Sequence, residues 1–301
     1  MKTVLVTGAS GFIGRHTLSL LQAHRYEVHA VSSKVVPSTS IIWHRANLLN
    51  PEEIRSLVSS IRPTHLLHLA WIATPRVFWQ SPENLNWIES SLELVRAFAK
   101  CGGKRIVVAG SSAEYTPSTL CTEDSNSFLP ATLYGKSKRE LYLILESFSK
   151  QMNIEFAWGY LFYLFGPSEH PDRFIPAVIL GLLRQKEIPC THGEQIRDYL
   201  YSADAASAFV ELLGSSLQGG VNIASGQGIS LQELARKAAR KIGGLDLLKF
   251  GSLPPPPNDP PEVVADIRRI KEQLKWQPCK TIDQRLDETI AWWKENLLHS
   301  V

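Results

Sequence analysis

Residues 3–14 read TVLVTGASGFIG, a short apolar run that leads directly into three glycines spaced three residues apart. The apolar run is typical of a buried strand, and the residues after Gly14 have the spacing of an amphipathic helix. At such a junction Gly8 permits a tight turn, Gly11 lets the backbone approach a pyrophosphate, and Gly14 lets the helix pack closely. The stretch therefore predicts a dinucleotide-binding βαβ unit. The expected cofactor contacts in the turn are Gly8, Ser10, Gly11, Phe12, Ile13 and Gly14.

The second expected strand, residues 27–32, bears on which nicotinamide dinucleotide is bound. A protein that uses NAD commonly ends this strand with Asp or Glu, which accepts hydrogen bonds from the ribose hydroxyls. Here the strand ends in Ser32, Ser33 and Lys34, whose hydroxyls and ammonium would bind a 2′-phosphate that a carboxylate would repel. Arg15 either adds to this site or faces solvent. We therefore expect NADP(H) as the preferred cofactor and NAD(H) as the alternative.

The first half of the chain alternates β-branched runs with amphipathic stretches, a pattern that indicates a parallel sheet covered on both faces. The expected strands are residues 3–7, 27–32, 41–44, 65–70, 105–109 and 155–160. The expected helices are residues 14–23, 51–60, 84–100 and 134–151.

After Gly166-Pro167 the alternation weakens, and the prolines between residues 254 and 261 predict an extended surface loop. Further helices are expected over residues 176–185, 202–213, 231–242 and 281–296. The expected fold class is α/β, a Rossmann-type doubly wound parallel sheet with a smaller C-terminal α/β substrate domain. We assign residues 1–165 to the dinucleotide-binding domain, with segments near 195–225 returning to it, and residues 166–301 to the substrate-binding domain.

Composition and charge argue against several classes of partner. The 301 residues are 44% apolar and 20% charged, which is typical of a globular protein. The net charge of +3 is small and no dense run of Lys or Arg occurs, so neither nucleic acid nor membrane is expected as a partner. No secretory signal or membrane span is visible, and the four cysteines lack a C-x-x-C pair. We expect a cytoplasmic protein with reduced thiols and no metal site.

Tyr134 and Lys138 are four residues apart, so on a helix both project from one face. A tyrosine loses its proton near pH ~10, and a nearby cation together with a positively charged nicotinamide would lower that value into the range of a general acid/base. The same spacing occurs by chance in many helices. It nevertheless predicts a proton-exchanging pair in this fold.

A serine hydroxyl is expected where residues 105–109 end at the carboxyl edge of the sheet, because ligands of open parallel sheets bind there. Ser112 is placed to hydrogen-bond a substrate oxygen while Tyr134 exchanges its proton and the nicotinamide exchanges a hydride. A turn-forming role is the simpler alternative for this serine.

The glycine turn, the serine and the Tyr134–Lys138 pair, in this order, resemble the extended short-chain dehydrogenase/reductase family, and within it the branch of nucleotide-sugar epimerases, dehydratases and ketoreductases. The resemblance covers nearly the whole chain. Its further segments are His68-Leu69-Ala70, Gly166-Pro167, Arg197-Asp198-Tyr199-Leu200-Tyr201 through Asp204, Asn222-Ile223-Ala224-Ser225-Gly226, and Leu274-Lys275-Trp276-Gln277-Pro278.

The resemblance implies a role for several residues. It implies that Arg197 pairs with the substrate diphosphate, for which a guanidinium fork is suited, with a salt bridge to Asp198 or Asp204 as the alternative. It also implies a homodimer through the helices at residues 84–100 and 134–151. The implied catalytic residues are Ser112, Tyr134 and Lys138. The implied further cofactor contacts are Leu69, Ala70 and Lys138. The implied contacts to a nucleotide-sugar substrate are Ser112, Glu114, Tyr163 and Arg197.

Some positions depart from the family pattern. The 4,6-dehydratases carry an Asp-Glu pair after the catalytic hydroxyl residue, where this chain has Ala113 and Glu114, so simple 4,6-dehydration is disfavoured. The family's Arg and Asn before Gly-Pro are Tyr160 and Tyr163 here, which leaves the substrate open. Candidates for a second acid/base are Cys121 and His170, although an isolated Cys or His is more often structural. Candidates for the pocket lining, or alternatively for core or dimer packing, are Trp71, Trp79 and Trp87.

These observations predict an NADP(H)-dependent reductase of a nucleotide-activated keto-sugar, with hydride delivered to C4 and a proton from Tyr134. The alternative is an NAD-dependent nucleotide-sugar epimerase or dehydratase. Reduction of a ketone without a nucleotide is a third hypothesis. A noncatalytic dinucleotide sensor is less favoured, because it has no need to keep Ser112, Tyr134 and Lys138 together.

Overall fold

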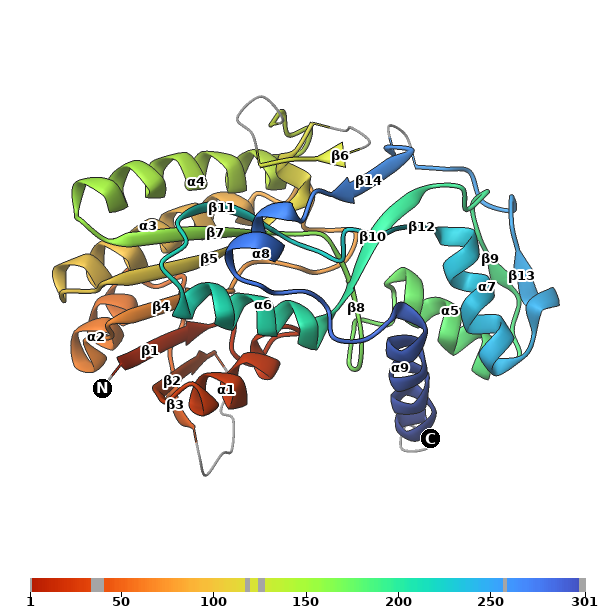
Figure 1. The fold of residues 1–301 in the computed structure, drawn as a ribbon, viewed down its shortest axis with the longest axis horizontal. Helices are drawn as coiled ribbons and strands as arrows, with labels where there is room; N and C mark the ends of the chain where they lie inside the picture. Colours follow the sequence, from red (N-terminus) through yellow and green to blue (C-terminus); the bar gives the residue numbers. More distant parts are fainter. Residues whose placement is uncertain (1, 34–40, 117–119, 124–127, 257–258, 298–301) are drawn as a thin grey trace.

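The computed structural model describes residues 2–33, 41–116, 120–123, 128–256 and 259–297. Within these residues the largest element is a seven-stranded sheet in the order β11-β7-β5-β4-β1-β2-β3, which lies in the lobe on the left of Figure 1. All neighbouring strands in it are parallel. Its strands are β1 (Lys2–Thr7), β2 (Tyr26–Ser32), β3 (Ile42–Arg45), β4 (His65–His68), β5 (Arg105–Ser111), β7 (Glu155–Leu161) and β11 (Gly219–Ile223).

The strand order reverses at β1, and this reversal positions the site. The chain proceeds from β1 through β2 to β3 on one side, and from β4 through β5 to β7 on the other. Ligands of open α/β sheets bind beyond the carboxyl ends of the strands at such a switch point. The glycine turn and residues 69–70 follow β1 and β4, the two strands that meet there.

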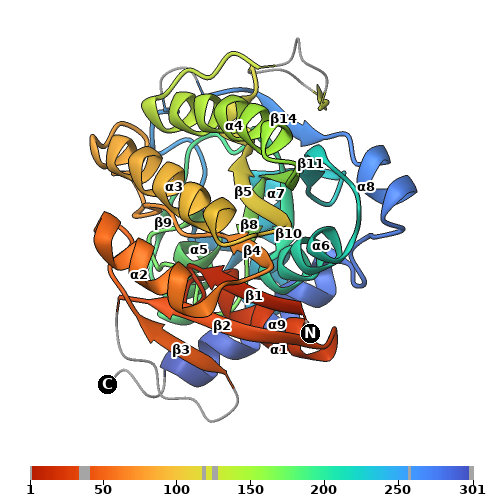
Figure 2. The same ribbon diagram turned by 90° about the vertical axis from the view of Figure 1, so that its left-hand side faces the viewer.

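Helices cover both faces of the sheet, as Figure 2 shows. On one face lie α2 (Pro51–Ile61), α3 (Glu83–Lys100) and α4 (Leu133–Gln151), and on the other α1 (Gly14–Ala23) and α6 (Ser202–Gly214). Alternate residues of a strand point to opposite faces, so Leu5 packs in the core beneath α2 to α4, while Val4 and Val6 pack beneath α1 and α6. The continuous apolar runs of the strands are explained by this double burial.

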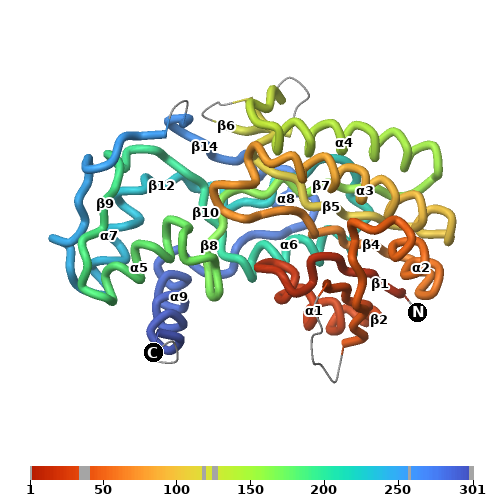
Figure 3. Tube along the Cα trace, turned by 180° about the vertical axis from the view of Figure 1, so that it is seen from behind, coloured from red at the N-terminus to blue at the C-terminus, as the bar shows by residue number. Residues whose placement is uncertain are grey.

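The second lobe is built around β10 (Ile196–Tyr201), which lies where the two lobes meet (Figure 3). It pairs with β8 (Tyr163–Phe165), β12 (Gly228–Ser230) and β14 (Glu262–Ala265), and β14 pairs with β6 (Leu120–Cys121). A second pair is formed by β9 (Ile188–Pro189) and β13 (Leu248–Lys249). The helices are α5 (Phe174–Leu183), α7 (Leu231–Ile242) and α9 (Ile282–Leu297). Shorter helices elsewhere are η1 (Ser112–Glu114), η3 (Leu245–Leu247) and α8 (Arg268–Gln273).

The predicted fold class is confirmed, and the long elements lie within a few residues of their predicted bounds. Two strand ends differ: β4 stops at His68 instead of residue 70, and β5 continues to Ser111 instead of residue 109. Of the segments near 195–225, α6 packs on the large sheet and β11 pairs with β7 in that sheet. In contrast, β10 pairs with strands of the smaller sheet. The division into residues 1–165 and 166–301 stays a prediction.

Candidate active site

The glycine turn closes tightly against the residues that follow β4. Gly8 has a φ of +66°, and a Cβ placed on it would lie 2.8 Å from the Ala70 backbone nitrogen. A Cβ on Gly14 would lie 2.1 Å from the Gly8 carbonyl oxygen, so the start of α1 packs directly on the turn. The Gly11 N–H donates to the Gly8 carbonyl oxygen at 2.9 Å. Side chains are excluded here, which leaves bare backbone at the amino end of α1, where phosphate oxygens bind.

The ends of β1 and β4 are joined through His68. Thr7 Oγ1 accepts the N–H groups of Leu69 and Ala70 at 3.2 Å each, so its own hydrogen is free to point to His68 Nδ1, 2.6 Å away. His68 Nε2 then donates to Ser91 Oγ at 2.9 Å. Burial lowers the pKa of His68 to about 3, so the ring is neutral. This network holds Leu69 and Ala70 beside the glycine turn, where the resemblance places cofactor contacts.

The end of β2 carries hydroxyl groups and no carboxylate. Ser32 is buried, with its Oγ 3.4 Å from Ser10 Oγ, and Ser33 is exposed. Lys34 lies outside the described residues. Arg15 is exposed and donates from Nε to the Gly11 carbonyl oxygen at 3.1 Å, so part of its side chain is held against the turn. On the turn itself Ser10 is exposed, and the half-buried positions are Phe12 and Ile13.

Tyr134 and Lys138 lie on the first two turns of α4. Thr132 caps this helix, since its Oγ1 accepts the Gly135 N–H at 3.1 Å. A Cβ on Gly135 would lie 2.2 Å from the Ala113 carbonyl oxygen, so the helix start packs on the backbone of η1. The cap and the glycine together place the Tyr–Lys pair beside the carboxyl end of β5.

Burial disfavours the charged form of both groups. It raises the pKa of Tyr134 to about 12, and a hydrogen bond with the Ser111 side chain opposes this rise. It lowers the pKa of Lys138 to about 7, and the charge of Glu114 opposes this fall. Lys138 Nζ donates to the Ala109 carbonyl oxygen at 2.8 Å. Burial thus disfavours a charged phenolate at Tyr134, and nearby positive charge favours it.

Two adjacent serines lie at the end of β5, and the assignment of the catalytic hydroxyl to Ser112 stays a prediction. Because β5 runs two residues beyond Ala109, Ser111 is the last residue of the strand and Ser112 is the first of η1. The Ser111 Oγ accepts the Ala113 N–H at 3.2 Å, and the Ser111 side chain acts to lower the pKa of Tyr134. The carboxyl edge of the sheet thus carries two adjacent serines, Ser111 and Ser112.

Glu114, predicted as a substrate contact, is buried behind the end of β5, and that role stays a prediction. Its side chain is 0% exposed. Its Oε1 accepts the Ser111 N–H at 2.8 Å and the Trp158 indole N–H at 3.1 Å. Burial raises the pKa of this carboxyl to about 8. Glu114 is thus an interior group behind the end of β5.

Arg197 forms an ion pair with Asp259, which the sequence did not indicate. Its Nη2 lies 2.6 Å from Asp259 Oδ1, and the guanidinium lies 5.4 Å from the centre of the half-buried Tyr163 ring. Asp198 instead accepts N–H groups of residues 225 and 226, and Asp204 pairs with a cation of α9. A substrate diphosphate would therefore compete with Asp259 for this guanidinium.

Three further residues lie around the Tyr134–Lys138 pair. The Trp71 ring centre lies 3.8 Å from Lys138 Nζ, and the Trp79 carbonyl oxygen accepts the Tyr134 N–H at 3.1 Å. Arg173 comes from the second lobe, donates to the backbone of residue 73 at 3.3 Å, and its charge acts to lower the pKa of Tyr134. Sequence reasoning missed Arg173, because no local pattern joins it to the segment after β4.

The other candidates for the site are less central. Trp87 lies beside Trp71, with ring centres 6.1 Å apart. Cys121 is buried in β6, and His170 is exposed, with its Nδ1 accepting the Asp172 N–H at 3.2 Å. A second acid/base role for Cys121 or His170 stays a prediction.

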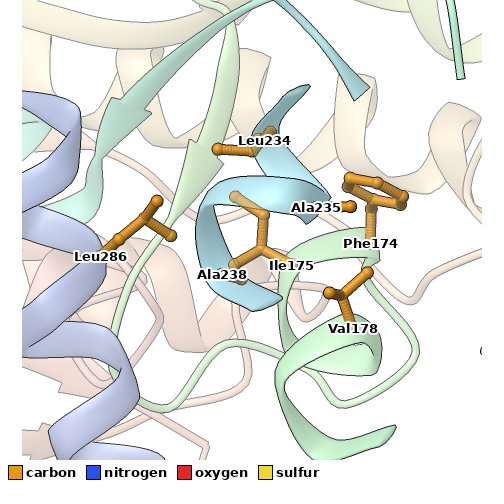
Figure 4. Close-up of a pocket in the computed structure, with 7 residues that line it drawn as sticks. All are labelled: Phe174, Ile175, Val178, Leu234, Ala235, Ala238 and Leu286. Atoms are coloured by element: carbon orange, nitrogen blue, oxygen red, sulfur yellow. The ribbon is translucent and has the colours of Figure 1, made fainter. Parts of the chain in front are cut away.

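An apolar pocket in the second lobe lies between α5, α7 and α9 (Figure 4). Carbon side chains line it and belong to the core of that lobe, so it offers no polar group to orient a ligand. They are Phe174, Ile175, Val178, Leu234, Ala235, Ala238 and Leu286. Within the described ranges no group of three or more His, Cys, Asp or Glu is arranged to hold a metal ion. No helix of the described part of the chain has the length and apolar character needed to cross a bilayer.

Comparison with known proteins gives similarity along the whole chain. The model of the NAD dependent epimerase/dehydratase family matches residues 4–224. UDP-glucuronic acid decarboxylase 1 of Xenopus tropicalis is 26% identical over 313 residues, which cover 99% of this chain and 73% of that protein. UDP-glucose 4-epimerase of Bacillus subtilis is 24% identical over 339 residues, which cover 98% of this chain and 97% of that protein. The structure of Thermus thermophilus UDP-glucose 4-epimerase with NAD has a TM-score of 0.86 at 22% identity, over 97% of this chain and 99% of that one.

Proposed function

This chain belongs to the NAD dependent epimerase/dehydratase family of extended short-chain dehydrogenase/reductases, and we propose that it epimerises a nucleotide sugar by removing and returning a hydride. The family consists of oxidoreductase-type enzymes that act on nucleotide sugars, so the chain is an enzyme. The observation that carries the proposal is the Ser111–Tyr134–Lys138 arrangement at the carboxyl edge of a nucleotide-binding sheet. This proposal replaces the 4-ketoreductase expected from the sequence as the first candidate, because both relatives described above lie outside that class.

The glycine turn fits a dinucleotide. A Cβ on Gly8 or Gly14 would meet backbone at 2.8 or 2.1 Å, so only a bare turn can form at the start of α1. We assign the pyrophosphate to this turn, and the neighbouring contacts to Leu69, Ala70 and Lys138. When bound, the nicotinamide supplies hydride transfer to and from a sugar carbon. NAD(H) is the first choice of cofactor, since the family and the solved relative use NAD.

Tyr134 exchanges the proton of the reacting sugar hydroxyl in this proposal. Ser112, which the resemblance gives as the hydroxyl residue, and the adjacent Ser111 are the proposed hydrogen-bond partners of the same sugar oxygen. Lys138, buried one helical turn away, favours the tyrosinate through its charge. The three groups thus move one proton between Tyr134 and the sugar as the hydroxyl becomes a carbonyl and the carbonyl a hydroxyl again.

Elimination of water is disfavoured by the residues that follow the hydroxyl residue. The resemblance places the acid and base of the 4,6-dehydratases directly after it. The resemblance gives that role to Ser112, so the two positions hold Ala113 and Glu114, and the acid of the pair is missing. The chain therefore lacks the acid/base pair for 4,6-dehydration, which favours epimerisation.

Substrate binding and assembly remain proposals that particular contacts support. Arg197 and Tyr163, which pack together between β8 and β10, are the proposed contacts to the nucleotide diphosphate. We propose residues 166–301 as the substrate-binding domain on the same ground. A homodimer through α3 and α4 is supported by apolar side chains that stay exposed on these helices, which are Leu85, Leu143 and Ile144.

A second candidate function is the NADP(H)-dependent 4-ketoreductase. Ser32 and Ser33 end β2 without a carboxylate, and the register partner of Ser32 is the exposed Arg45. Hydroxyl groups and a cation at this edge suit a 2′-phosphate. This candidate predicts net consumption of NADPH, which an epimerase does not require.

Product analysis separates the two candidates. Purified protein is incubated with NAD and a panel of nucleotide sugars, and the sugar ring protons are followed by NMR. We expect an epimer to appear while the cofactor absorbance returns to its starting value. Net NADPH oxidation with a nucleotide keto-sugar, and no epimer, would favour the ketoreductase instead. The Tyr134→Phe variant should bind the cofactor normally and lose turnover roughly 10²- to 10⁴-fold.

A further inference from the structure

The segment between β4 and α3, residues 71–82, is built from turns and irregular backbone and lies against the start of α4. Its Trp79 carbonyl oxygen accepts the Tyr134 N–H at 3.1 Å, and Gln80 Oε1 accepts the Leu133 N–H at 3.3 Å. Both N–H groups belong to the first turn of α4, where the helix itself offers no acceptor. The β4–α3 segment thus supplies acceptors that the start of this helix lacks.

Two aromatic rings of the segment pack against the ring of Tyr134. The ring centres of Phe78 and Tyr134 are 4.8 Å apart with an angle of 89° between the planes, and those of Trp79 and Tyr134 are 5.9 Å apart at 88°. Edge-to-face packing of this kind is favourable for aromatic pairs. Phe78 is 6% exposed and Trp79 is 39% exposed, so Phe78 is the interior one of the two. The position of the phenol therefore depends on where the segment holds Phe78.

Arg173 reaches this segment from the second lobe, where it directly precedes α5. Its Nη2 donates to the Ala73 carbonyl oxygen at 3.3 Å, and its guanidinium carbon lies 5.3 Å from the centre of the Phe78 ring. In the described part of residues 166–301 it is the one residue with a hydrogen bond to residues 71–82. A single side chain of the second lobe thus contacts the segment at two places, five positions apart.

We propose that Arg173 is a positioning residue for Tyr134: it holds the β4–α3 segment so that Phe78 stays packed against the phenol ring, and so ties the second lobe to the group that exchanges the proton. This inference rests on the proposed function, in which Tyr134 exchanges a proton with a sugar hydroxyl. A displacement of about 1 Å at a reacting group can lower the rate roughly 100-fold, so a contact that acts through one intervening ring is sufficient to matter.

Arg173→Met tests the proposal in turnover, because it keeps a long apolar side chain and removes the charge and the donors. We expect kcat to fall roughly 10- to 100-fold, while KM for the nucleotide sugar and binding of the cofactor change by less than about threefold. Arg173→Lys should restore most of kcat, since an ammonium can lie over Phe78 and donate to Ala73. A raised KM with an unchanged kcat would make Arg173 a substrate contact and overturns the inference.

Arg236→Met is the matched control. Arg236 is a half-buried residue of α7 in the same lobe, and its guanidinium carbon lies 5.6 Å from the centre of the Phe250 ring. The substitution therefore removes the same kind of contact without touching the β4–α3 segment. Its kcat should match that of the unchanged chain, and a loss equal to that of Arg173→Met overturns the inference.

A double-mutant cycle tests whether Arg173 acts through Phe78. Phe78→Leu removes the ring that lies between the guanidinium and Tyr134, so Arg173→Met has less left to disturb in that background. We expect the loss of kcat in the double variant to be clearly smaller than the product of the two single losses. Losses that simply multiply would mean that the two residues act independently, which overturns the inference.

Amide hydrogen exchange of the protein without ligand gives a readout that does not need turnover. The Tyr134 N–H should exchange roughly tenfold faster in Arg173→Met, or in Arg173→Gln if the Met variant does not fold, because its acceptor on the segment is held less firmly. The Gly135 N–H, which donates to Thr132 Oγ1 at 3.1 Å, is the internal reference and should not change. Unchanged exchange at Tyr134, or an equal rise at Gly135, overturns the inference. If no nucleotide sugar is epimerised but exchange rises at Tyr134 alone, the proposed function fails while the positioning role of Arg173 stands.

Discussion

The Lys138 ammonium lies 3.8 Å from the centre of the Trp71 ring, so an aromatic face covers the charge beside Tyr134. Trp71 is fixed there by its indole N–H, which donates to Asn84 Oδ1 at 2.8 Å. Asn84 is fully buried and donates in turn to backbone carbonyls of residues 78 and 81. The segment between β4 and α3 is thus folded so that it presents an aromatic ring to the lysine.

Replacing Trp71 with Leu should lower activity mainly at alkaline pH. A desolvated cation–π contact contributes about 1–2 kcal/mol, so its loss shifts Lys138 toward the neutral amine by roughly 5- to 30-fold. Trp71→Phe keeps a ring but also loses the hydrogen bond to Asn84, which makes it the matched control. The measurement is kcat as a function of pH. Equal alkaline losses in the two variants would assign the effect to the hydrogen bond instead of the ring.

Ser111→Ala and Ser112→Ala should differ strongly although the residues are adjacent. Ser111 ends β5 and acts to lower the pKa of Tyr134, whereas Ser112 begins η1. We expect Ser111→Ala to lower kcat by roughly 10²- to 10³-fold, the usual effect of losing a hydrogen-bond donor to a reacting oxygen. Ser112→Ala should change kcat by less than about threefold. The measurement is kcat of each variant at saturating cofactor. A larger loss of kcat in Ser112→Ala than in Ser111→Ala would support Ser112, the residue predicted from the sequence.

Local pattern was sufficient for most of the sheet, because β-branched runs and glycine spacing act over a few residues. It was insufficient at the two strand ends that shape the site. β5 continues to Ser111 because β7 runs beside it, with Ser111 in register with Leu161. β4 stops at His68, beyond which Thr7 Oγ1 accepts the next two N–H groups, while the Leu69 N–H also donates to the Thr7 carbonyl oxygen at 3.2 Å. Both effects come from residues more than 40 positions away.

The same limit explains the partners of charged groups. Asp259 lies 62 residues from Arg197, and no spacing in the chain indicated their pairing. The resemblance implied that Glu114 contacts the substrate. The turn of η1 directs its carboxyl inward, where it accepts the Trp158 indole N–H. Trp158 lies 44 residues further along the chain, so no local pattern indicated this partner.

Arg197→Ala should weaken binding of the nucleotide sugar and leave cofactor binding unchanged. Charge-assisted hydrogen bonds contribute about 1.5–3 kcal/mol, so we expect KM to rise roughly 10- to 100-fold. Asp259→Asn should act in the opposite direction, because it removes the carboxylate that holds Arg197 Nη2 at 2.6 Å. Isothermal titration with a nucleotide diphosphate measures both variants. Weaker binding in Asp259→Asn would mean that the ion pair positions Arg197 for the ligand and does not compete with it.

Glu169→Gln should stabilise the protein at alkaline pH. Glu169 is 8% exposed, its Oε2 lacks a hydrogen-bond partner among the described residues, and burial raises its pKa to about 8 despite the opposing charge of Arg173. An unfolded glutamate titrates near pH ~4.3. Between these two values the folded chain binds more protons than the unfolded chain, so the contribution of Glu169 to stability is complete below pH ~4.3 and is lost as the pH rises through about 8.

The neutral amide of Glu169→Gln does not have to be deprotonated, so the variant avoids this loss. Each unit of pKa shift corresponds to about 1.4 kcal/mol. At pH ~9 we expect the free energy of unfolding of the variant to exceed that of the unchanged chain by a few kcal/mol more than it does at pH ~4. Urea unfolding at the two pH values measures it. Glu187→Gln is the matched control, because its side chain is 72% exposed and pairs with Lys249 at the surface. A gain of the same size in Glu187→Gln, or none in Glu169→Gln, would contradict the view that the buried carboxylate of Glu169 destabilises the fold at high pH.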